Sequence, residues 1–339
     1  MITRLLVPLN DTNFYAAIAS CLEDYPVNGS CSASVHGAMP DWNVSLVTNM
    51  AFAFGSRPFR PTFDADISRW HTSAVTDMTG MFHYVAAFNQ PLAAWNVSLV
   101  TDMTNMFRYD AAFNQPLEAW NVSRVTDMGY MFSQAFRFDQ PLAAWNVSRV
   151  TTMYSMFNSA AKFNQPLAAW NVSRVTDMRY MFSRAAAFNQ PLAAWNVSLV
   201  TNMRAMFSYA SSFNQPLEAW NVWRVTDMRY MFSSAAAFNQ PLEAWNVSRV
   251  TNMPYMFFGA AAFNQSLAAW NVSRVTNMGG MFWNAKAFAQ NITGWTTTAL
   301  KLSTNMFPGA DAWLKQFTRD SAAGGGDFDG PPDAWSVAL

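Results

Sequence analysis

Apolar positions recur along this chain with a period of 25 residues. One unit, FNQPLAAWNVSRVTDMRYMFSRAAA, runs from Phe163 to Ala187 and is repeated with few changes from Phe63 onward. Its first phenylalanine recurs at Phe88, Phe113, Phe138, Phe163, Phe188, Phe213, Phe238, Phe263 and Phe288. Its tryptophan recurs at Trp70, Trp95, Trp120, Trp145, Trp170, Trp195, Trp220, Trp245, Trp270 and Trp295. A strict period of this length predicts a solenoid, in which each repeat is one turn stacked on the last.

Within one unit, the apolar spacing predicts a short helix and a short strand. Side chains at offsets of 0, 3, 4, 7 and 10 residues would share one helical stripe, as in Met178, Met181, Phe182, Ala185 and Phe188. Pro191 cannot continue that helix, whereas Val172 and Val175, bounded by polar residues, suit a strand. The predicted fold is an α/β solenoid, a right-handed leucine-rich-repeat-like superhelix of about ten 25-residue turns.

Residues 1–40 depart from the repeat and are predicted to form an N-terminal helical cap. Their apolar side chains fall on one helical face at Phe14, Ala17, Ile18, Cys21 and Leu22. Both cysteines of the chain, Cys21 and Cys31, lie in this cap. They either form a disulfide, which would place the protein in an oxidising compartment, or remain two buried free thiols.

The repeat solenoid is predicted over residues 41–313. A small insertion, GSRPFRPTF, interrupts it early and contains Pro58 and Pro61. Residues 314–339 are rich in Gly, Pro and Asp toward their end, so we expect a C-terminal cap and a flexible tail. Two apolar residues would anchor this tail: Trp335 and Leu339.

Composition and motif content argue against several classes of function. Charged residues make up 12% and the formal net charge is zero, which argues against bulk affinity for nucleic acid. No apolar run reaches the roughly 18 residues that a membrane helix needs, so no membrane span is expected. The three histidines, His36, His71 and His83, have no nucleophile or acid pattern around them. We therefore expect no enzyme activity, no cofactor and no metal site.

Polar residues that recur once per unit have structural interpretations. The asparagine of Asn-Val-Ser is expected to hydrogen-bond a turn, although its eight copies are also glycosylation sequons. The Asp or Asn before the first Met, as at Asp177 and Asn202, would cap a helix, with calcium between turns as the alternative. The threonine at Thr176 and its equivalents is expected to hydrogen-bond within a turn, with an ice-facing surface as the alternative.

The consensus W-N-V-S-x-V-T-D-M-x-x-M-F-x-x-A-x-x-F-N-Q resembles a repeat of about 25 residues found in bacterial surface proteins and widespread in algae. That family is similar to the BspA-like leucine-rich repeats. The resemblance spans Asp41 to Trp313 and is carried by eleven near-copies. It implies an α/β solenoid of leucine-rich-repeat type and a surface or interaction role.

Positions that vary between units indicate a binding surface. If the Met, Phe and Ala positions face inward, the offsets between them face solvent. There the units place arginine and aromatic residues: Arg179, Tyr180, Arg204, Arg229, Tyr230, Tyr255, Phe258 and Trp283. Tyr, Trp and Arg are enriched at interface hot spots. Drift alone would leave small polar residues on this face, as at Ser183, Ser208 and Ser233.

A second arginine column precedes the Val-Thr pair of many units. Its members are Arg124, Arg149, Arg174, Arg224, Arg249 and Arg274. Stacked cations need compensation from acids, water or a partner. The nearby Asp column, together with Glu118, Glu218 and Glu243, could provide it and leave a solvated, self-neutralised surface.

The predicted function is a non-enzymatic repeat scaffold that mediates protein–protein interaction within or onto a larger assembly. The alternative is a cell-surface adhesin or carbohydrate-binding solenoid, so a glycan is the second class of partner. The expected location is an oxidising compartment, which means the extracellular space, the cell surface or an organelle lumen.

Overall fold

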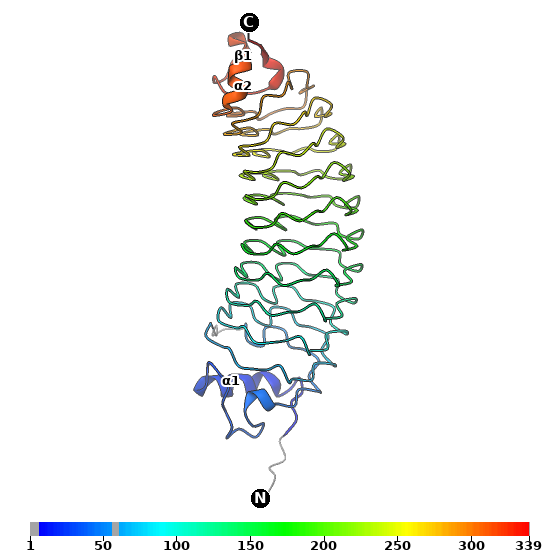
Figure 1. Cartoon of the computed structure of the whole chain (residues 1–339), viewed down its shortest axis with the longest axis vertical. Helices are drawn as coiled ribbons and strands as arrows, with labels where there is room; N and C mark the ends of the chain where they lie inside the picture. The colour runs from blue at the N-terminus through cyan, green and yellow to red at the C-terminus, as the bar shows by residue number, and fades with distance from the viewer. Residues whose placement is uncertain (1–6, 56–60, 339) are drawn as a thin grey trace, which may run out of the picture. The chain divides into compact units, whose positions relative to one another are not determined.

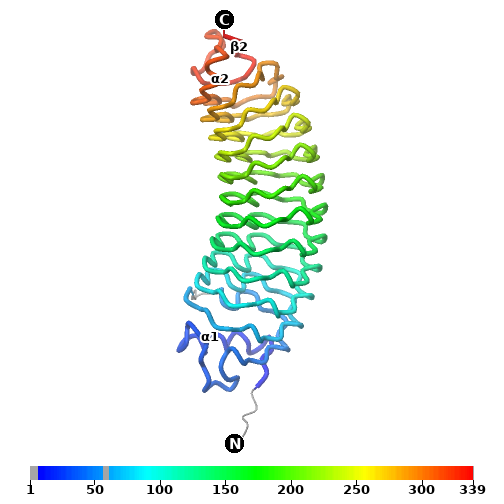
Figure 2. The backbone as a smooth tube through the Cα atoms, viewed as in Figure 1, coloured from blue at the N-terminus to red at the C-terminus, as the bar shows by residue number. Residues whose placement is uncertain are grey.

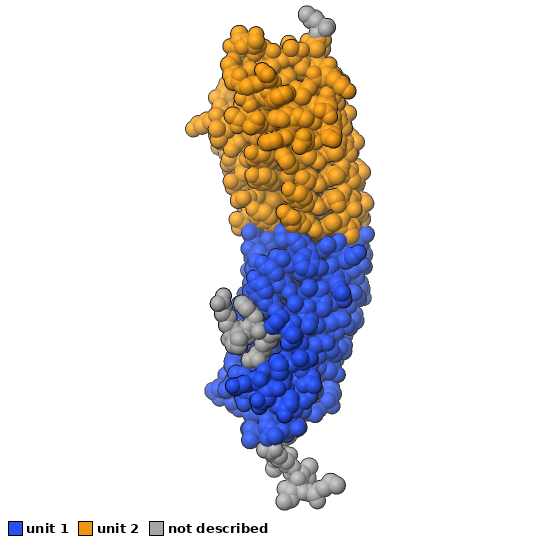
Figure 3. Space-filling view, turned by 90° about the vertical axis from the view of Figure 1, so that its left-hand side faces the viewer, with its two compact units in different colours: residues 1–170 blue, residues 171–339 orange. Residues whose placement is uncertain are grey.

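The computed structural model describes residues 7–55 and 61–338. Figures 1 and 2 show the repeats as stacked turns, and the chain divides into unit 1 (Met1–Trp170) and unit 2 (Asn171–Leu339), coloured separately in Figure 3. Adjacent turns pair through isolated parallel bridges, such as Asp77 with Asp102 in unit 1. Each unit is therefore a solenoid of 25-residue repeats. Pro58 and Leu339 lie outside the described residues.

Within the described ranges, helices and strands are confined to the two ends of the chain. They are α1 (Phe14–Asp24), η1 (Met39–Asp41), α2 (Asp311–Gln316), β1 (Phe317–Arg319), η2 (Ser321–Ala323), η3 (Pro332–Ala334) and β2 (Trp335–Val337). Strands β1 and β2 pair antiparallel, with Thr318 opposite Ser336. The prediction of a helix and a strand in each turn is wrong for the described repeats, whose only strand-like feature is the bridge.

Two consecutive tight turns stand where the helix was predicted. In the repeat that starts at Met203, each turn is closed by an N–H···O=C bond between residues three apart, with N···O distances of 3.2 and 3.1 Å. The third residues of these turns, Ala205 and Tyr209, have φ of 53° and 58°, as type II turns require. Both positions have φ between 52° and 67° in the repeats from Met78 onward. Such residues cannot belong to a right-handed helix.

Alternate N–H groups of these turns bond to the next repeat. In the repeat from Met203, the donors at offsets 0, 2, 4 and 6 reach carbonyl oxygens 24 residues later, at 2.7–3.0 Å. Those donors are unavailable for the bonds of an α-helix. The spacing alone could not reveal this, because the tight turns bury the side chains that a helix would have buried. The inward residues are as predicted: Met178, Met181, Phe182, Ala185 and Phe188.

Stacked rings form the core of each unit. In unit 2 the rings of Trp195 and Trp220 are almost parallel, with centroids 6.5 Å apart, and Phe213 and Phe238 stack at 6.0 Å. The indole Nε1–H of Trp220 donates to the carbonyl oxygen of Leu192, 28 residues earlier, at 2.9 Å. The predicted Trp, Phe, Met, Val and Leu columns are thus confirmed as core.

Helix α1 and the residues before it cap the first turn of unit 1. The Phe14 ring lies 5.8 Å from that of Trp70, centroid to centroid. An Asp11 carboxylate oxygen accepts the N–H of Thr48 at 2.8 Å, and the Tyr15 hydroxyl donates to the carbonyl oxygen of Ala51 at 2.9 Å. Burial raises the pKa of Tyr15 to about 12, so the hydroxyl keeps its proton. A disulfide joins Cys21 to Cys31 in the same cap.

The C-terminal segment forms a cap that also includes residues expected to be a flexible tail. Strand β2 returns to β1, and the Trp335 ring meets the Phe307 ring edge-on at 5.2 Å. An Asp329 carboxylate oxygen accepts the N–H of Asn305 at 2.7 Å. Residues 317–338 therefore supply hydrogen-bond acceptors to the last turn, in place of another repeat.

Truncating one stacked ring should weaken unit 2 locally. Phe238 is fully buried between Phe213 and Phe263. We expect Phe238→Ala to cost about 3–5 kcal/mol and to reduce hydrogen-exchange protection mainly in the adjoining turns, because each repeat contacts only its neighbours. Loss of protection spread evenly over unit 2, or no loss near residue 238, would contradict this description.

Asp110 is an exception in the core of unit 1. It stands where other repeats have alanine, such as Ala135, and it is fully buried. One of its carboxylate oxygens accepts the N–H of Phe113 at 3.3 Å, whereas Oδ2 has no hydrogen-bond partner among the described residues. Burial raises the pKa of Asp110 well above its usual range. As pH rises, Asp110 therefore loses its proton at a lower pH in the unfolded chain than in the folded unit.

This difference in proton binding makes unit 1 less stable as pH rises. Above the ordinary aspartate pKa of about 3.9 the unfolded chain ionises and the folded unit does not. The stability that the protonated side chain provides is therefore fully present below that value. It decreases as pH rises from there to the pKa of Asp110 in the folded unit. We expect Asp110→Asn to flatten this dependence and to be more stable than wild type at pH 8. Parallel denaturation profiles of the two proteins from pH 4 to pH 8 would refute it.

Candidate functional site

Two stacked tyrosines form the centre of the candidate site in unit 2. The rings of Tyr230 and Tyr255 are nearly parallel, with centroids 5.1 Å apart, and Tyr230 is 36% exposed. Tyr255 lies over the backbone of Gly280, where a Cβ would come within 2.3 Å of the ring. Glycine at that position therefore leaves the space in which the Tyr255 ring lies.

An aromatic groove of about 260 Å³ runs along one side of this stack. It is lined by Ser208, Tyr209, Tyr230, Ser233, Tyr255 and Phe258. The two serines are buried, which corrects the expectation that Ser183, Ser208 and Ser233 lie on a solvated face. Because Ser208 and Ser233 are small, the larger rings around them rise above the surface. The groove is an exposed aromatic concavity with hydroxyl groups at its base.

A second groove, of about 340 Å³, adjoins the same tyrosine stack. The residues that give it its character are Arg204, Arg229, Tyr230, Pro254 and Tyr255. We call it the arginine groove. The tyrosine stack therefore forms part of two neighbouring surfaces, one aromatic and one with two guanidinium groups.

The arginines near this surface differ in their pairing. Arg229 forms an ion pair with Asp227 at 2.6 Å, and hydrogen bonding to Asp227 raises the pKa of Arg229. Arg179 pairs likewise with Asp177 at 2.5 Å. Arg204 has an asparagine in place of that aspartate, and its Nε is buried without a hydrogen-bond partner among the described residues. Its cation thus lacks the carboxylate that its neighbours have.

The eight predicted binding residues mostly adjoin these grooves. Tyr230, Tyr255 and Phe258 line the aromatic groove, and Arg204 and Arg229 line the arginine groove. The Trp283 ring packs edge-on against Phe258 with centroids 5.7 Å apart. Toward the preceding repeat, the guanidinium carbon of Arg204 lies 5.5 Å from the ring centre of Tyr180. Arg179 directly precedes Tyr180 in the chain. None of the eight is a core residue.

The tyrosines of this surface have an unfavourable backbone conformation. Tyr180, Tyr209, Tyr230 and Tyr255 have φ between 55° and 59°, in the left-handed region. That region costs a residue with a side chain roughly 1–2 kcal/mol, and equivalent positions are glycine or asparagine in other turns, as at Gly280 and Asn105. Local backbone preference therefore does not explain tyrosine at these positions.

Three groove residues and one further residue were left out of the predicted binding residues. Tyr209, 45% exposed, stands at one of the solvent-facing offsets of the repeat but was not included, and Ser208 and Ser233 were expected on a solvated face. Trp223 is 36% exposed, with its ring centre 5.0 and 5.2 Å from the guanidinium carbons of Arg224 and Arg249. Its signal was the one repeat that reads Asn-Val-Trp where others read Asn-Val-Ser.

The second arginine column is not self-neutralised among the described residues. The three ion pairs between described residues involve Arg69, Arg179 and Arg229, and none of these arginines belongs to the column. The Asp and Asn side chains expected to cap a helix instead accept backbone N–H groups two residues later, as Asp227 does from Arg229 at 3.0 Å. Column side chains such as Arg249 are exposed.

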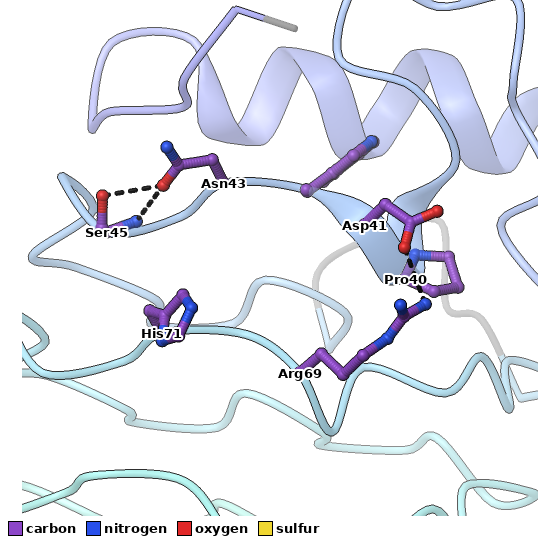
Figure 4. Close-up of a pocket in the computed structure, with 7 residues that line it drawn as sticks. Pro40, Asp41, Asn43, Ser45, Arg69 and His71 are labelled. Atoms are coloured by element: carbon purple, nitrogen blue, oxygen red, sulfur yellow. Dashed lines mark hydrogen bonds and ion pairs between the residues drawn. The ribbon is translucent and has the colours of Figure 1, made fainter.

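Unit 1 contains a polar pocket of about 450 Å³ between its first turns (Figure 4). Asp41 pairs there with Arg69 at 2.7 Å, and Asn43 accepts a hydrogen bond from the Ser45 hydroxyl at 2.7 Å. His71 lines the same pocket. The Asp41–Arg69 pair joins the first two turns, whereas the Asn43–Ser45 bond lies within one turn.

A smaller aromatic cluster occupies the next turns of unit 1. Tyr84 and Tyr109 stack with centroids 4.1 Å apart, and the guanidinium of Arg108 lies 4.1 Å from the ring centre of Tyr130. Burial, with a smaller contribution from Arg108, lowers the pKa of His83 to about 4. His83 is therefore neutral at physiological pH.

Comparison with known proteins matches the repeat itself. The model of a family described as "Mycoplasma protein of unknown function, DUF285" matches residues 28–145, 137–241 and 215–319. No curated protein sequence matches the chain. Across residues 7–55 and 61–338, no helix has the length and apolar character needed to cross a bilayer.

Two solved structures show a distant likeness. The crystal structure of a TLR13–ssRNA13 complex has 12% identity and a TM-score of 0.31, and the match covers 82% of this chain and 39% of that one. A leucine-rich cell surface protein from Faecalibacterium prausnitzii A2-165 has 11% identity and a TM-score of 0.32, with 76% and 83% covered. The chain thus spans well under half of the first of these proteins.

Proposed function

The chain belongs to the repeat family described as Mycoplasma protein of unknown function, DUF285, and from this premise we propose that it is a non-enzymatic scaffold that binds another protein. The proposed binding surface consists of the aromatic groove and the arginine groove of unit 2. We also propose that the turns wind right-handed, as the resemblance to leucine-rich repeats implies.

The aromatic groove is the observation that supports this proposal most directly. Tyr209 and Tyr230 are each more than a third exposed, and Tyr255 and Phe258 are half-buried beside them. Exposed aromatic surface of this kind usually marks an interaction site. A concave, partly apolar surface with hydroxyl groups fits an apolar side chain of a partner, held by hydrogen bonds around it.

Arg204 supports a more specific partner chemistry. Its guanidinium lacks an acidic partner among the described residues, whereas Arg179 and Arg229 on the neighbouring turns are paired. A carboxylate from the partner would satisfy this cation, and such charge-assisted bonds fix orientation as well as add affinity. We propose that the bound segment has an apolar anchor followed by an acidic side chain.

Removing the aromatic groove should weaken partner binding without unfolding unit 2. The variant Tyr230→Asn, Tyr255→Asn, Phe258→Ser uses residues that the same positions have in other repeats, at Asn105 and Ser233. We expect it to lose more than about 2 kcal/mol of affinity for the partner, the scale of interface hot spots. Quantitative affinity capture from cells of origin, followed by titration of the purified partner, measures this loss.

The matched control removes the aromatic pair of unit 1, with Tyr84→Ser and Tyr109→Ser. Serine occurs at that repeat position at Ser159 and Ser234. The control should retain wild-type affinity, and hydrogen exchange should confirm that both variants are folded. Equal capture of the partner by all three proteins would place the binding site elsewhere.

We further propose that the protein is located in an oxidising compartment, namely outside the cell, on its surface or in an organelle lumen. The disulfide between Cys21 and Cys31, 10 residues apart, supports this location.

A loop of this length should contribute roughly 2–3 kcal/mol to the stability of the cap. Intact-mass analysis after alkylation without reductant should detect no modified thiol in protein from its native compartment, and two after reduction. Two modified thiols before reduction would contradict both the bridge and the proposed location.

A further inference from the structure

Three consecutive turns of unit 2 present an exposed arginine at the same repeat position: Arg224, Arg249 and Arg274. No described carboxylate forms an ion pair with any of them. We call these three residues, with Trp223 beside them, the arginine strip. It shares no residue with the aromatic groove or the arginine groove, so a ligand on the strip would bind independently of a protein in those grooves.

The spacing of the strip is fixed by backbone hydrogen bonds. The N–H of Thr251 bonds to the carbonyl oxygen of Thr226 at 2.9 Å, and the N–H of Thr276 to that of Thr251 at 2.9 Å. These threonines follow the arginines by two residues, so successive arginines leave the backbone about 4.8 Å apart, the spacing of hydrogen-bonded strands. This distance is close to the length of one sugar residue in an extended polysaccharide.

The fold does not require cations at this position. The equivalent residue is leucine in other repeats, at Leu99 and Leu199. Stacked guanidinium groups without acids repel one another, and an anionic chain laid along them would relieve that repulsion. A row of charges with a fixed spacing suits a polymer whose anionic groups recur regularly.

Trp223 adds a feature that charge alone does not explain. Its indole ring is exposed, and the guanidinium groups of Arg224 and Arg249 lie within about 5 Å of the ring centre. Other repeats have serine at this position, as at Ser248. The two guanidinium groups lie over the indole ring, so Trp223 fixes the positions of these cations and with them the positions at which acidic groups would bind.

We propose that the arginine strip binds an extended acidic polysaccharide with uronate carboxylates, and that Trp223 positions Arg224 and Arg249 for them. A carboxylate matches the planar fork of guanidinium in a bidentate pair. Single-stranded nucleic acid fits less well, because its binding sites stack successive bases on several aromatic residues, whereas the strip has one. An extended acidic peptide presents the side chains of one face about 6.8 Å apart, which does not match the spacing of the strip.

The test measures binding of the full chain to immobilised polygalacturonate, with fully methyl-esterified polygalacturonate as the uncharged control. We expect binding to the first and not the second, and affinity that falls as salt rises because the contacts are screened. Replacing the cations, with Arg224→Leu, Arg249→Leu and Arg274→Leu, should weaken binding at least about tenfold. Trp223→Ser should also weaken it while leaving the salt dependence unchanged.

The matched control removes three other exposed cations of unit 2, with Lys286→Ala, Lys301→Ala and Lys315→Ala. It has the same net charge as the arginine variant and should bind like wild type. Equal weakening of both variants would show nonspecific electrostatics and overturn the proposal. So would tighter binding to carrageenan, polyglutamate or oligothymidylate, or no binding to polygalacturonate at physiological salt. The aromatic-groove variant should bind polygalacturonate normally, which separates this test from that of protein binding.

Discussion

The left-handed residues of the tight turns control how this chain uses its hydrogen bonds. With positive φ at two positions of a repeat, successive N–H groups alternate between bonds inside the turn and bonds to the next repeat. Methionine and phenylalanine then face the core, and the left-handed tyrosines, such as Tyr230, face outward. The backbone arrangement that joins the turns is therefore also the one that presents the binding side chains.

The period predicted the core well, because stacked turns place each inward position of the repeat in a continuous column. It placed Trp220 and Phe238 correctly and separated both ends from the repeat. It could not distinguish a helix from paired tight turns, since the offsets 0, 3, 4 and 7 bury the same side chains in both. Backbone conformation was the missing information, and tyrosine at left-handed positions concealed the glycine and asparagine signal that marks such turns.

The candidate site was only partly predictable for a related reason. A varying column signals that the core does not constrain it, which correctly identified Tyr255 and Phe258 as surface residues. A varying column gives no information on how deeply its side chains are buried. Ser208 was therefore expected on the surface, although this small residue is buried at the base of a groove. The pairing of the arginines follows from the sequence only once the contact between residues two apart is known: Arg229 has Asp227 at that distance, whereas Arg204 has Asn202.

The direction of the bonds between repeats makes the two ends of the array chemically different. The N–H groups of the tight turns bond toward the following repeat, so the tight turns of the first repeat are left with free carbonyl oxygens and those of the last with free N–H groups. Tyr15 donates to the former and Asp329 accepts from the latter. Without its cap, each end would expose these backbone groups to pairing with another molecule, as the edge strand of a sheet does. By occupying them, the caps protect the ends against such association as well as stabilising them.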